Sequence, residues 1–313
     1  MKKAEIQEHG FITYPRRFIA YRWFKPLLAG LLFGAFYMPM TLLAVVLGAA
    51  ASGSRDSAMK LIEGLGQAYD GFDVYSAGGV IATVGSVAAM IPALFLASKI
   101  VKDRPFSSYG SSMGGFRLGV FLKSLLPALA AVIPMIVLMV IDGRTGENRF
   151  SAAGFILVTL IGPLQCIAEE YLFRGFLMQT LGGWFRIPWL AILLQVIPFA
   201  LGHPYSIAGV LAVSILALAL GFTTHYTKGI EAGSALHVVN NMLAFYGSGL
   251  GFGKIASETT WKDFSLTAAA AVIFIVLVVI LDRKFHWYDR IRKDDVTPFN
   301  EKTVRRMEAR THK

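Results

Sequence analysis

Six residues in the second half of the chain have side chains that could do chemistry. They are Glu169, Glu170, Arg174, His203, His237 and Asn241. All six lie in stretches that are otherwise apolar and resemble membrane spans. Because ionisable residues are costly inside a bilayer, their presence there indicates function by default.

The spacing of these residues sorts their roles. Glu170 and Arg174 are four residues apart, so on a helix they share a face and can form an ion pair. Glu169 is rotated by about 100° from that face, which leaves it without this partner and free to face a cavity. His237 and Asn241 are also four apart and present two polar groups on one face.

The predicted depths of the three groups agree with one another. At about 1.5 Å per residue, Glu169, His203 and His237 lie roughly 18, 22 and 12 Å from the inner ends of their helices. These depths are compatible with a single buried site that is reached from the cytoplasmic side.

A carboxylate, two imidazoles and an amide form a set suited to hydrolysis. A carboxylate beside a histidine can hold and deprotonate a water. A second histidine and an asparagine can donate hydrogen bonds to the oxyanion of a tetrahedral intermediate. Alternatively, Glu169, His203 and His237 could bind Zn²⁺ and generate a metal hydroxide. The HExxH spacing is absent, so such a zinc site would have to be assembled across helices.

Each group also has a structural explanation. Glu170 and Arg174 could be an ion pair that only stabilises the fold, and His203, which precedes a proline, could be a hydrogen-bond donor at a helix end. His237 with Asn241 could join two helices. The three groups occur on different helices of one apolar chain, and this combination favours function.

Three further polar residues near these motifs are interpreted as structural. His225 and Glu231 lie near the inner ends of their helices, where polar groups cost little, and Glu231 suits a helix N-terminus. Cys166 lies three residues before Glu169, and we interpret it as a small packing residue rather than as a nucleophile.

The composition shows what kind of chain must position these residues. Of its 313 residues, 55% are hydrophobic and 16% are charged, whereas soluble proteins have roughly 25% charged residues. This composition predicts an all-α, polytopic membrane protein. The single cysteine excludes an intrachain disulfide. The net charge is +10, but the sequence contains no nucleic-acid-binding motif. The positive charge is better explained by topology signals and by contact with anionic lipid.

We predict eight transmembrane helices with both termini in the cytoplasm. In this arrangement the inner segments hold 24 of the 30 lysines and arginines, as the positive-inside rule requires. A sharp turn at Pro204 must separate two of the helices, and 52–76 forms an outer loop. The predicted spans are 26–51, 77–100, 119–141, 151–181, 188–203, 205–227, 230–248 and 264–282.

The chain divides into five predicted segments, without a second domain or an internal repeat. They are a cytoplasmic or interfacial N-terminal segment (1–25), N-terminal transmembrane helices (26–149), catalytic helices (150–248), an outer loop with the last transmembrane helix (249–282) and a basic cytoplasmic tail (283–313).

The three motifs together resemble the CPBP intramembrane proteases, also called Abi or type II CAAX prenyl endopeptidase-like proteins. The first motif, Glu-Glu-xxx-Arg, is present as Glu169 to Arg174. The second, Phe-xxx-His, is present as Phe199 to His203, and the third, His-xxx-Asn, as His237 to Asn241. They occur in the order that the family requires, and the resemblance covers roughly residues 150–248.

This resemblance implies an eight-span helical core that cleaves peptide bonds near the membrane surface. It implies that Glu169 activates water with His203, that His237 and Asn241 stabilise the oxyanion, and that Arg174 supports the glutamate pair. Members have been described both as metalloproteases and as metal-independent glutamate proteases. Eukaryotic relatives trim prenylated CAAX proteins, whereas bacterial relatives include bacteriocin-immunity and peptide-maturation proteins.

The resulting hypothesis is an integral membrane endopeptidase whose substrates are membrane-associated peptides or lipidated proteins. Membrane lipids are the other expected partners, and no nucleic-acid partner is expected. Zn²⁺ is an alternative cofactor that the sequence neither requires nor excludes. The absence of a eukaryotic targeting feature favours a bacterial plasma membrane. Two rival hypotheses are a catalytically idle immunity or scaffold protein of the same fold, and a proton-coupled transporter that uses the same buried groups.

Overall fold

The described part of the chain folds entirely into helices. A computed structural model describes residues 10–66, 73–143, 146–203, 205–252 and 259–288. Within these ranges the only β-type contact is an isolated bridge between Ser111 and Gly229. The prediction of an all-α polytopic membrane fold is confirmed.

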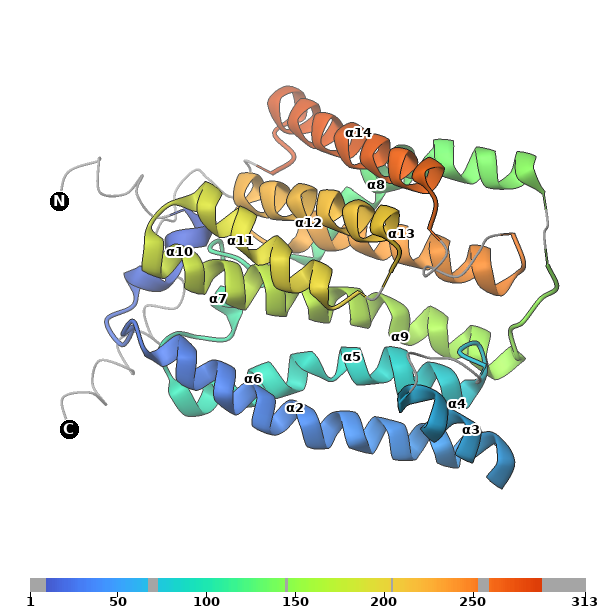
Figure 1. Cartoon of the computed structure of the whole chain (residues 1–313). Coiled ribbons are helices and arrows are strands. Elements are labelled where there is room, and N and C mark those ends of the chain that lie inside the picture. The colour runs from blue at the N-terminus through green and yellow to red at the C-terminus, as the bar shows by residue number, and fades with distance from the viewer. Residues whose placement is uncertain (1–9, 67–72, 144–145, 204, 253–258, 289–313) are drawn as a thin grey trace.

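Long helices run along one common direction and form the bundle (Figure 1). Six stretches are long and apolar enough to cross a membrane. They are α2 (Lys25–Ala50), the run Ala77–Val101, α8 (Leu118–Asp142), the run Ala152–Phe185, α12 (Ile207–Thr227) and α14 (Trp261–Phe285).

Two of these stretches contain π-helical turns. The first consists of α4 (Ala77–Val80), the π-helical η2 (Ile81–Gly85), α5 (Ser86–Ala88) and α6 (Met90–Val101). The second consists of α9 (Ala152–Glu170), the π-helical η3 (Tyr171–Met178) and α10 (Gln179–Phe185).

Two further helices occupy the remaining predicted spans. They are α11 (Pro188–Leu201), an apolar helix of 14 residues, and α13 (Glu231–Gly249), which has 19 residues. Because α13 carries the polar residues of the third motif, it is less apolar than its neighbours. The helices therefore lie where the eight spans were predicted, with boundaries that differ by a few residues.

The shorter elements lie at the two ends of the bundle. The predicted outer loop contains α3 (Arg55–Gly66), and the opposite end holds the 3₁₀ helix η1 (Phe11–Arg17) and α7 (Ser107–Gly110). The turn predicted at Pro204 and most of the predicted basic tail lie outside the described residues.

Local sequence signals fix several helix starts. Ser151 and Ser206 accept hydrogen bonds from the backbone N–H groups of Gly154 and Gly209, and so cap α9 and α12. Thr260 and Asp263 form a capping box at the start of α14. Pro188 occupies the first turn of α11, where its missing N–H costs nothing.

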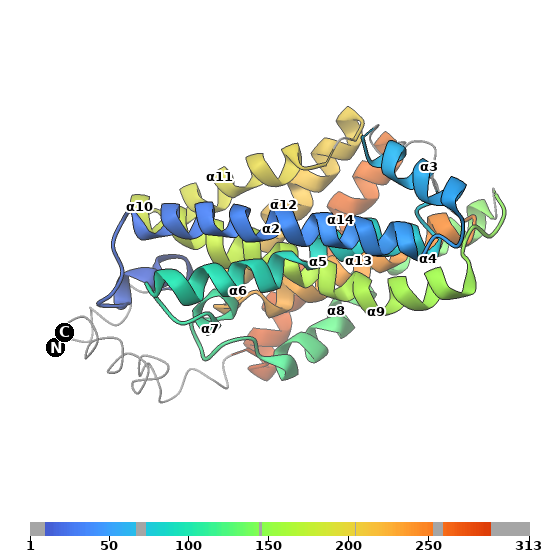
Figure 2. The same cartoon turned by 90° about the horizontal axis from the view of Figure 1, so that it is seen from below.

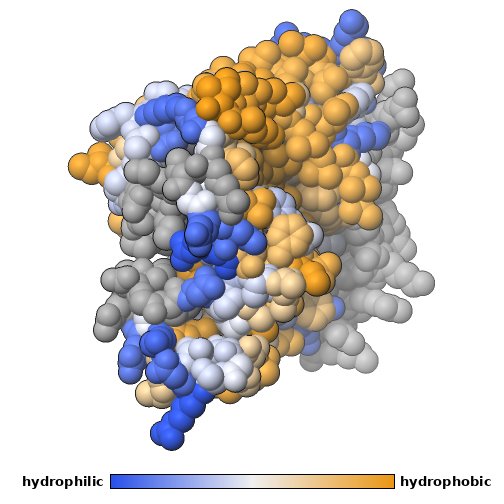
Figure 3. Space-filling model, turned by 90° about the vertical axis from the view of Figure 1, so that its right-hand side faces the viewer, coloured by the Kyte–Doolittle hydropathy of each residue, from blue (hydrophilic) through white to orange (hydrophobic). Residues whose placement is uncertain are grey.

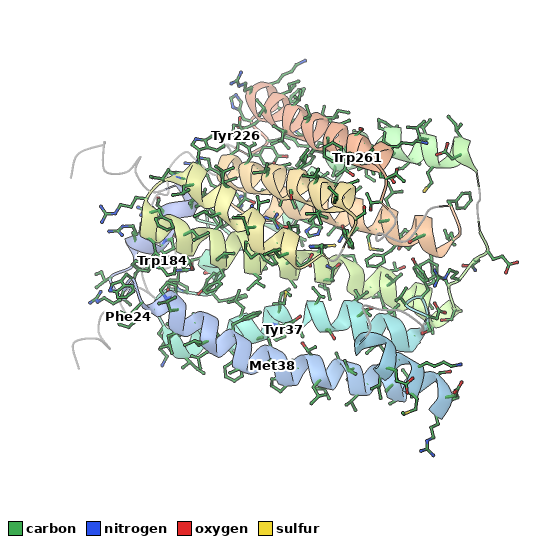
Figure 4. The ribbon with its side chains drawn as sticks, viewed as in Figure 1. Phe24, Tyr37, Met38, Trp184, Tyr226 and Trp261 are labelled. Atoms are coloured by element: carbon green, nitrogen blue, oxygen red, sulfur yellow. The ribbon has the colours of Figure 1, made fainter. Side chains whose placement is uncertain are left out.

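The outer surface of the bundle is apolar, as a lipid-facing surface must be. Met38, labelled on α2 in Figure 4, is 74% exposed, and α2 as a whole is the least buried of the long helices. At the end where α3 lies, hydrophilic residues gather toward the left and lower parts of the face, and hydrophobic residues cover its upper right (Figure 3). Trp184 lies at one end of the bundle, and Trp261 lies toward the other end, at the start of α14 (Figure 4).

The described part of the N-terminal segment, from Gly10 onward, is packed into the protein. Phe11, Ile12 and Tyr14 in η1 are buried, and Ile12 lies so close to Gly182 of α10 that a methyl group there would collide with it. The indole of Trp184 donates a hydrogen bond to the carbonyl of Trp23 at 2.7 Å. This segment, predicted to be cytoplasmic or interfacial, thus also anchors the end of the helix that carries the first motif.

Helix α13 lies between several of the other long helices of the bundle. It packs along α8 and α9 and also against α12 (Figure 2). Most of the first half of α13, from Glu231 to Val238, is buried. This central position brings the third motif against the first.

Candidate active site

Close packing between α9 and α13 sets the distance between the first and third motifs. A methyl group at Gly162 of α9 would come within 2.7 Å of the Met242 sulfur of α13. Near the start of α13, a methyl group at Gly233 would lie 3.6 Å from Glu170 Oε2, an ordinary van der Waals contact. The glycine at position 162 therefore allows the helices to approach, and a close approach lets side chains from both helices bond directly.

The centre of the site is a buried triad of Glu170, Arg174 and His237. Arg174 Nη1 donates to Glu170 Oε1 at 2.9 Å, within one helix as the four-residue spacing predicts. The same oxygen lies 2.8 Å from His237 Nδ1, so one carboxylate oxygen joins the two helices. Both Glu170 and Arg174 are fully buried.

Glu169 contacts the same histidine from the other side. Its Oε2 atom lies 3.2 Å from His237 Nε2, although the geometry does not satisfy a hydrogen bond. Among the described residues this oxygen has no hydrogen-bond partner, and neither does Glu170 Oε2. His237 therefore lies between two glutamates, and each glutamate has one oxygen without a hydrogen-bond partner among the described residues.

Arg174 is held by two further contacts. Its guanidinium lies over the ring of Phe199, 4.4 Å from the centroid, and its Nη2 donates to the carbonyl of Ala217 in α12 at 3.3 Å. Gln195 of α11 donates to the same carbonyl at 3.2 Å. These contacts tie α11 and α12 to the first motif.

His203 joins the site through Phe199. Its Nδ1 atom lies 2.7 Å from the carbonyl oxygen of Phe199, as in a helix-end hydrogen bond. The Phe199 ring lies 4.9 Å from the His203 ring and 6.0 Å from the His237 ring, between centroids. His203 is also close enough to Glu169 to interact with it electrostatically. The pairing of these two residues on a water stays a prediction.

Asn241 extends the polar row on α13. Its Nδ2 atom lies 3.3 Å from His237 Nε2, and its Oδ1 atom accepts a hydrogen bond from Asn240 at 3.2 Å. Asn240 thereby orients the amide of Asn241. The Nε2 atom of His237 thus faces both Glu169 and Asn241, and its Nδ1 atom faces Glu170.

The site has a closed side and an open side. Glu170, Arg174 and His237 are at most 1% exposed, whereas Glu169 is 7% exposed. His203 and Asn241 are half-buried. The exposed part of this group of residues therefore lies at Glu169, His203 and Asn241, and the Glu170–Arg174 pair lies in its interior.

The segment that follows the two glutamates is π-helical. Segment η3 begins at Tyr171 and contains Arg174. Such segments are uncommon and are frequent at functional sites. Gly175 lies here because α7 passes close by, and a methyl group at Gly175 would come within 2.5 Å of the Tyr109 carbonyl oxygen.

A metal ion does not fit the groups as they are arranged. Within the described ranges, no three His, Cys, Asp or Glu side chains are grouped closely enough to hold one. Both ring nitrogens of His237 lie against glutamate oxygens instead of pointing with His203 toward a common centre. The three residues considered for Zn²⁺ therefore do not form a three-ligand set here.

The neighbouring residues interpreted as structural have structural surroundings. Glu231 forms a short ion pair with Arg117, 2.7 Å between Oε2 and Nη2. The ring of His225 lies 6.1 Å from that of Trp189. Cys166 is buried, and its thiol donates to Gln165 Oε1 at 3.4 Å.

The sequence analysis assigned no role to two residues that support the site. Asn240 orients Asn241, and Gln195 shares a carbonyl with Arg174. The sequence does indicate a role for Gln195, because a glutamine in the middle of the apolar run 188–201 is costly unless its side chain is hydrogen-bonded.

Comparison with known proteins agrees with the interpretation of the three motifs. Residues 150–243 match the family described as "Type II CAAX prenyl endopeptidase Rce1-like". This segment contains all six candidate residues, and the match confirms the resemblance that the motifs carry. This segment is therefore similar to that family of endopeptidases.

One curated relative is a Bacillus subtilis (strain 168) protein described as "Uncharacterized protein YyaK". It is 29% identical over 167 residues, which is 49% of this chain and 55% of the relative. The chain thus matches about half the length of this relative. Among solved structures, none matches the chain significantly.

Proposed function

We propose that the chain is an intramembrane endopeptidase that hydrolyses peptide bonds of membrane-associated substrates, in the manner of CAAX proteases. The observation that carries this proposal is the arrangement of Glu169. It is a buried carboxylate at the open side of the site, with an unpaired oxygen and a histidine at 3.2 Å. An unpaired carboxylate oxygen inside a membrane protein is costly, and a bound water would satisfy it.

Glu169 acts as the general base. It takes a proton from a water that is also held by His203, and the water oxygen attacks the carbonyl carbon of the substrate. Asn241, at the open side, donates a hydrogen bond to the oxyanion that forms. When the tetrahedral intermediate collapses, the proton on Glu169 passes to the nitrogen of the leaving amine.

Glu170 and Arg174 keep this constellation in place. Glu170 Oε1 binds both Arg174 and His237, and this fixes the imidazole beside Glu169. Because neither Glu170 nor Arg174 is accessible, we assign them a positioning role.

The substrate class follows from the surroundings of the site. The site lies between apolar helices, so a peptide that carries a lipid, or that itself lies at the membrane, has the easiest access. A bacterial plasma membrane is the proposed location, in keeping with the Bacillus subtilis relative.

The test is a cleavage assay of the purified, detergent-solubilised protein with a farnesylated CAAX peptide and an unprenylated control peptide. Glu169→Gln is expected to lower kcat by about 10²–10⁴-fold, the usual contribution of a general base. The matched control is Glu63→Gln, an exposed glutamate on α3, which should cleave like the wild type. Full activity of Glu169→Gln would contradict the proposed role. A biological effect that survives in the absence of any cleavage would favour the idle scaffold.

A further inference from the structure

We propose that Gln165 is a further catalytic residue, whose side-chain amide donates a hydrogen bond to the oxyanion. This inference rests on the proposed function and adds a second donor to the same site. It comes from comparing the glutamines of the described chain and from the contacts around His237.

The position of Gln165 places it beside the general base. It lies on α9 four residues before Glu169, so the two side chains share a helix face. Along the axis they are separated by one turn, about 6 Å. Both are 7% exposed and so lie at the same accessible edge of the bundle interior.

Gln165 differs from the other glutamines that the structure describes. Gln179 donates its amide N–H to the Ser108 carbonyl at 2.9 Å, and Gln195 donates to the carbonyls of Ile192 and Ala217. The bonds to Ser108 and Ala217 each join two separate segments of the fold. The Gln165 amide nitrogen makes no hydrogen bond to any described residue, and it is not one of the fully buried side-chain atoms that lack a partner. It is therefore a donor at the exposed edge of this side chain, where a substrate oxygen can accept from it.

The orientation of the amide is set by Cys166. The thiol donates to Gln165 Oε1 at 3.4 Å, so the oxygen is occupied and the N–H₂ group is the free end. The same thiol lies against the side chain of Asn241. The amides of Gln165 and Asn241 therefore flank Cys166 and approach one edge of the site from two helices.

The site needs a second donor because His237 is occupied. Its Nδ1 atom faces Glu170, and its Nε2 atom faces Glu169 and Asn241. An oxyanion is bound best by two donors that are fixed before the reaction. Asn241 supplies one of them, and Gln165 is the neighbouring amide with free N–H groups.

The step in which Gln165 acts is the addition of water. The water oxygen forms a bond to the carbonyl carbon, its proton moves to Glu169, and the carbonyl π electrons move onto oxygen. That oxyanion accepts hydrogen bonds from Gln165 Nε2 and Asn241 Nδ2. On collapse the C–N bond breaks, and the leaving nitrogen takes the proton from Glu169.

The decisive variant is Gln165→Met, which keeps the length of the side chain and removes its donors. We expect kcat for the peptide cleaved by the wild type to fall roughly 10²-fold, the effect of losing one oxyanion donor, with KM within about twofold. Leu160→Met, at a position on the same helix that is 64% exposed, is the matched control and should retain the wild-type kcat. Gln165→Leu is measured in parallel, and each rate is referred to the monodisperse, folded fraction.

The outcomes separate this inference from the proposed function. A kcat within twofold of the wild type in a folded Gln165→Met or Gln165→Leu protein would overturn the assignment of Gln165, while the loss of cleavage in Glu169→Gln would still support the protease. A rise in KM at unchanged kcat would also overturn it, since that result indicates ground-state binding. If the wild type cleaves no peptide, that result contradicts both the proposed function and the role of Gln165.

Discussion

Two buried Glu–Arg ion pairs in this protein have different geometries. Arg117 binds Glu231 with Nε to Oε1 at 2.9 Å and Nη2 to Oε2 at 2.7 Å, and its backbone N–H donates to Oε1 as well. Arg174 binds one oxygen of Glu170, and the other oxygen has no partner among the described residues. The first pair satisfies both oxygens of its carboxylate, whereas the second shares its carboxylate with a histidine.

This difference separates a structural ion pair from one that belongs to a site. The Arg117–Glu231 pair joins the start of α8 to the start of α13 and satisfies its carboxylate fully, although Arg117 Nη1 has no partner among the described residues. The Glu170–Arg174 pair leaves a carboxylate oxygen unsatisfied in the bundle interior, and such a cost is expected where groups are kept for chemistry.

The largest effect on stability is expected at the structural pair. Arg117→Met leaves Glu231 buried without its partner and should lower the free energy of unfolding by about 3–5 kcal/mol. The activity of the folded fraction should change little. Unfolding in detergent, followed by helix content, measures the first quantity, and cleavage per folded molecule measures the second.

A second substitution sharpens this test. Adding Glu231→Gln to Arg117→Met removes the unpaired charge and should restore part of the lost stability. If the double variant is no more stable than Arg117→Met, the charge of Glu231 is not the cause. A loss of activity in the folded fraction would instead link this pair to the site.

The next effect is expected at Gly175, close to the site pair. Gly175→Ala places a methyl group against the Tyr109 carbonyl and should destabilise the protein by about 1–3 kcal/mol. Gly34→Ala in α2 is the matched control, because nothing lies within 4 Å of the added methyl group. Equal melting temperatures for the two variants would contradict the contact between α7 and η3.

A smaller effect is expected from Arg174→Lys. Lysine keeps the charge but loses the planar guanidinium that lies over Phe199 and also reaches Ala217. A desolvated cation–π contact contributes about 2 kcal/mol. We therefore expect kcat to fall roughly 30-fold, with the protein still folded. Unchanged kinetics would mean that a positive charge alone suffices to position Glu170.

The smallest effect is expected from metal removal. Because His237 is engaged by two glutamates and no three-ligand group is present in the described chain, a strong chelator should leave cleavage within about twofold of the untreated protein. The assay is repeated after addition of Zn²⁺. Activity that is lost on chelation and restored by zinc would contradict this prediction.

The sequence alone predicted most of the architecture. Apolar runs of about 20 residues have few stable arrangements in lipid other than helices, and the described helices lie where such runs occur. The four-residue spacing of Glu170 and Arg174 also sufficed to predict their ion pair, because helix geometry fixes it. The three motifs identified the segment that matches the protease family.

Only the tertiary structure decided how the motifs meet. Helical periodicity places Glu169 and Glu170 on different faces, but it cannot show that His237 lies between them, because that contact depends on how closely α9 approaches α13. The same holds for Phe199, whose ring contacts Arg174 and both histidines. Spacing along one helix is set by local geometry, whereas contacts between helices depend on side-chain packing, which no single segment of the sequence specifies.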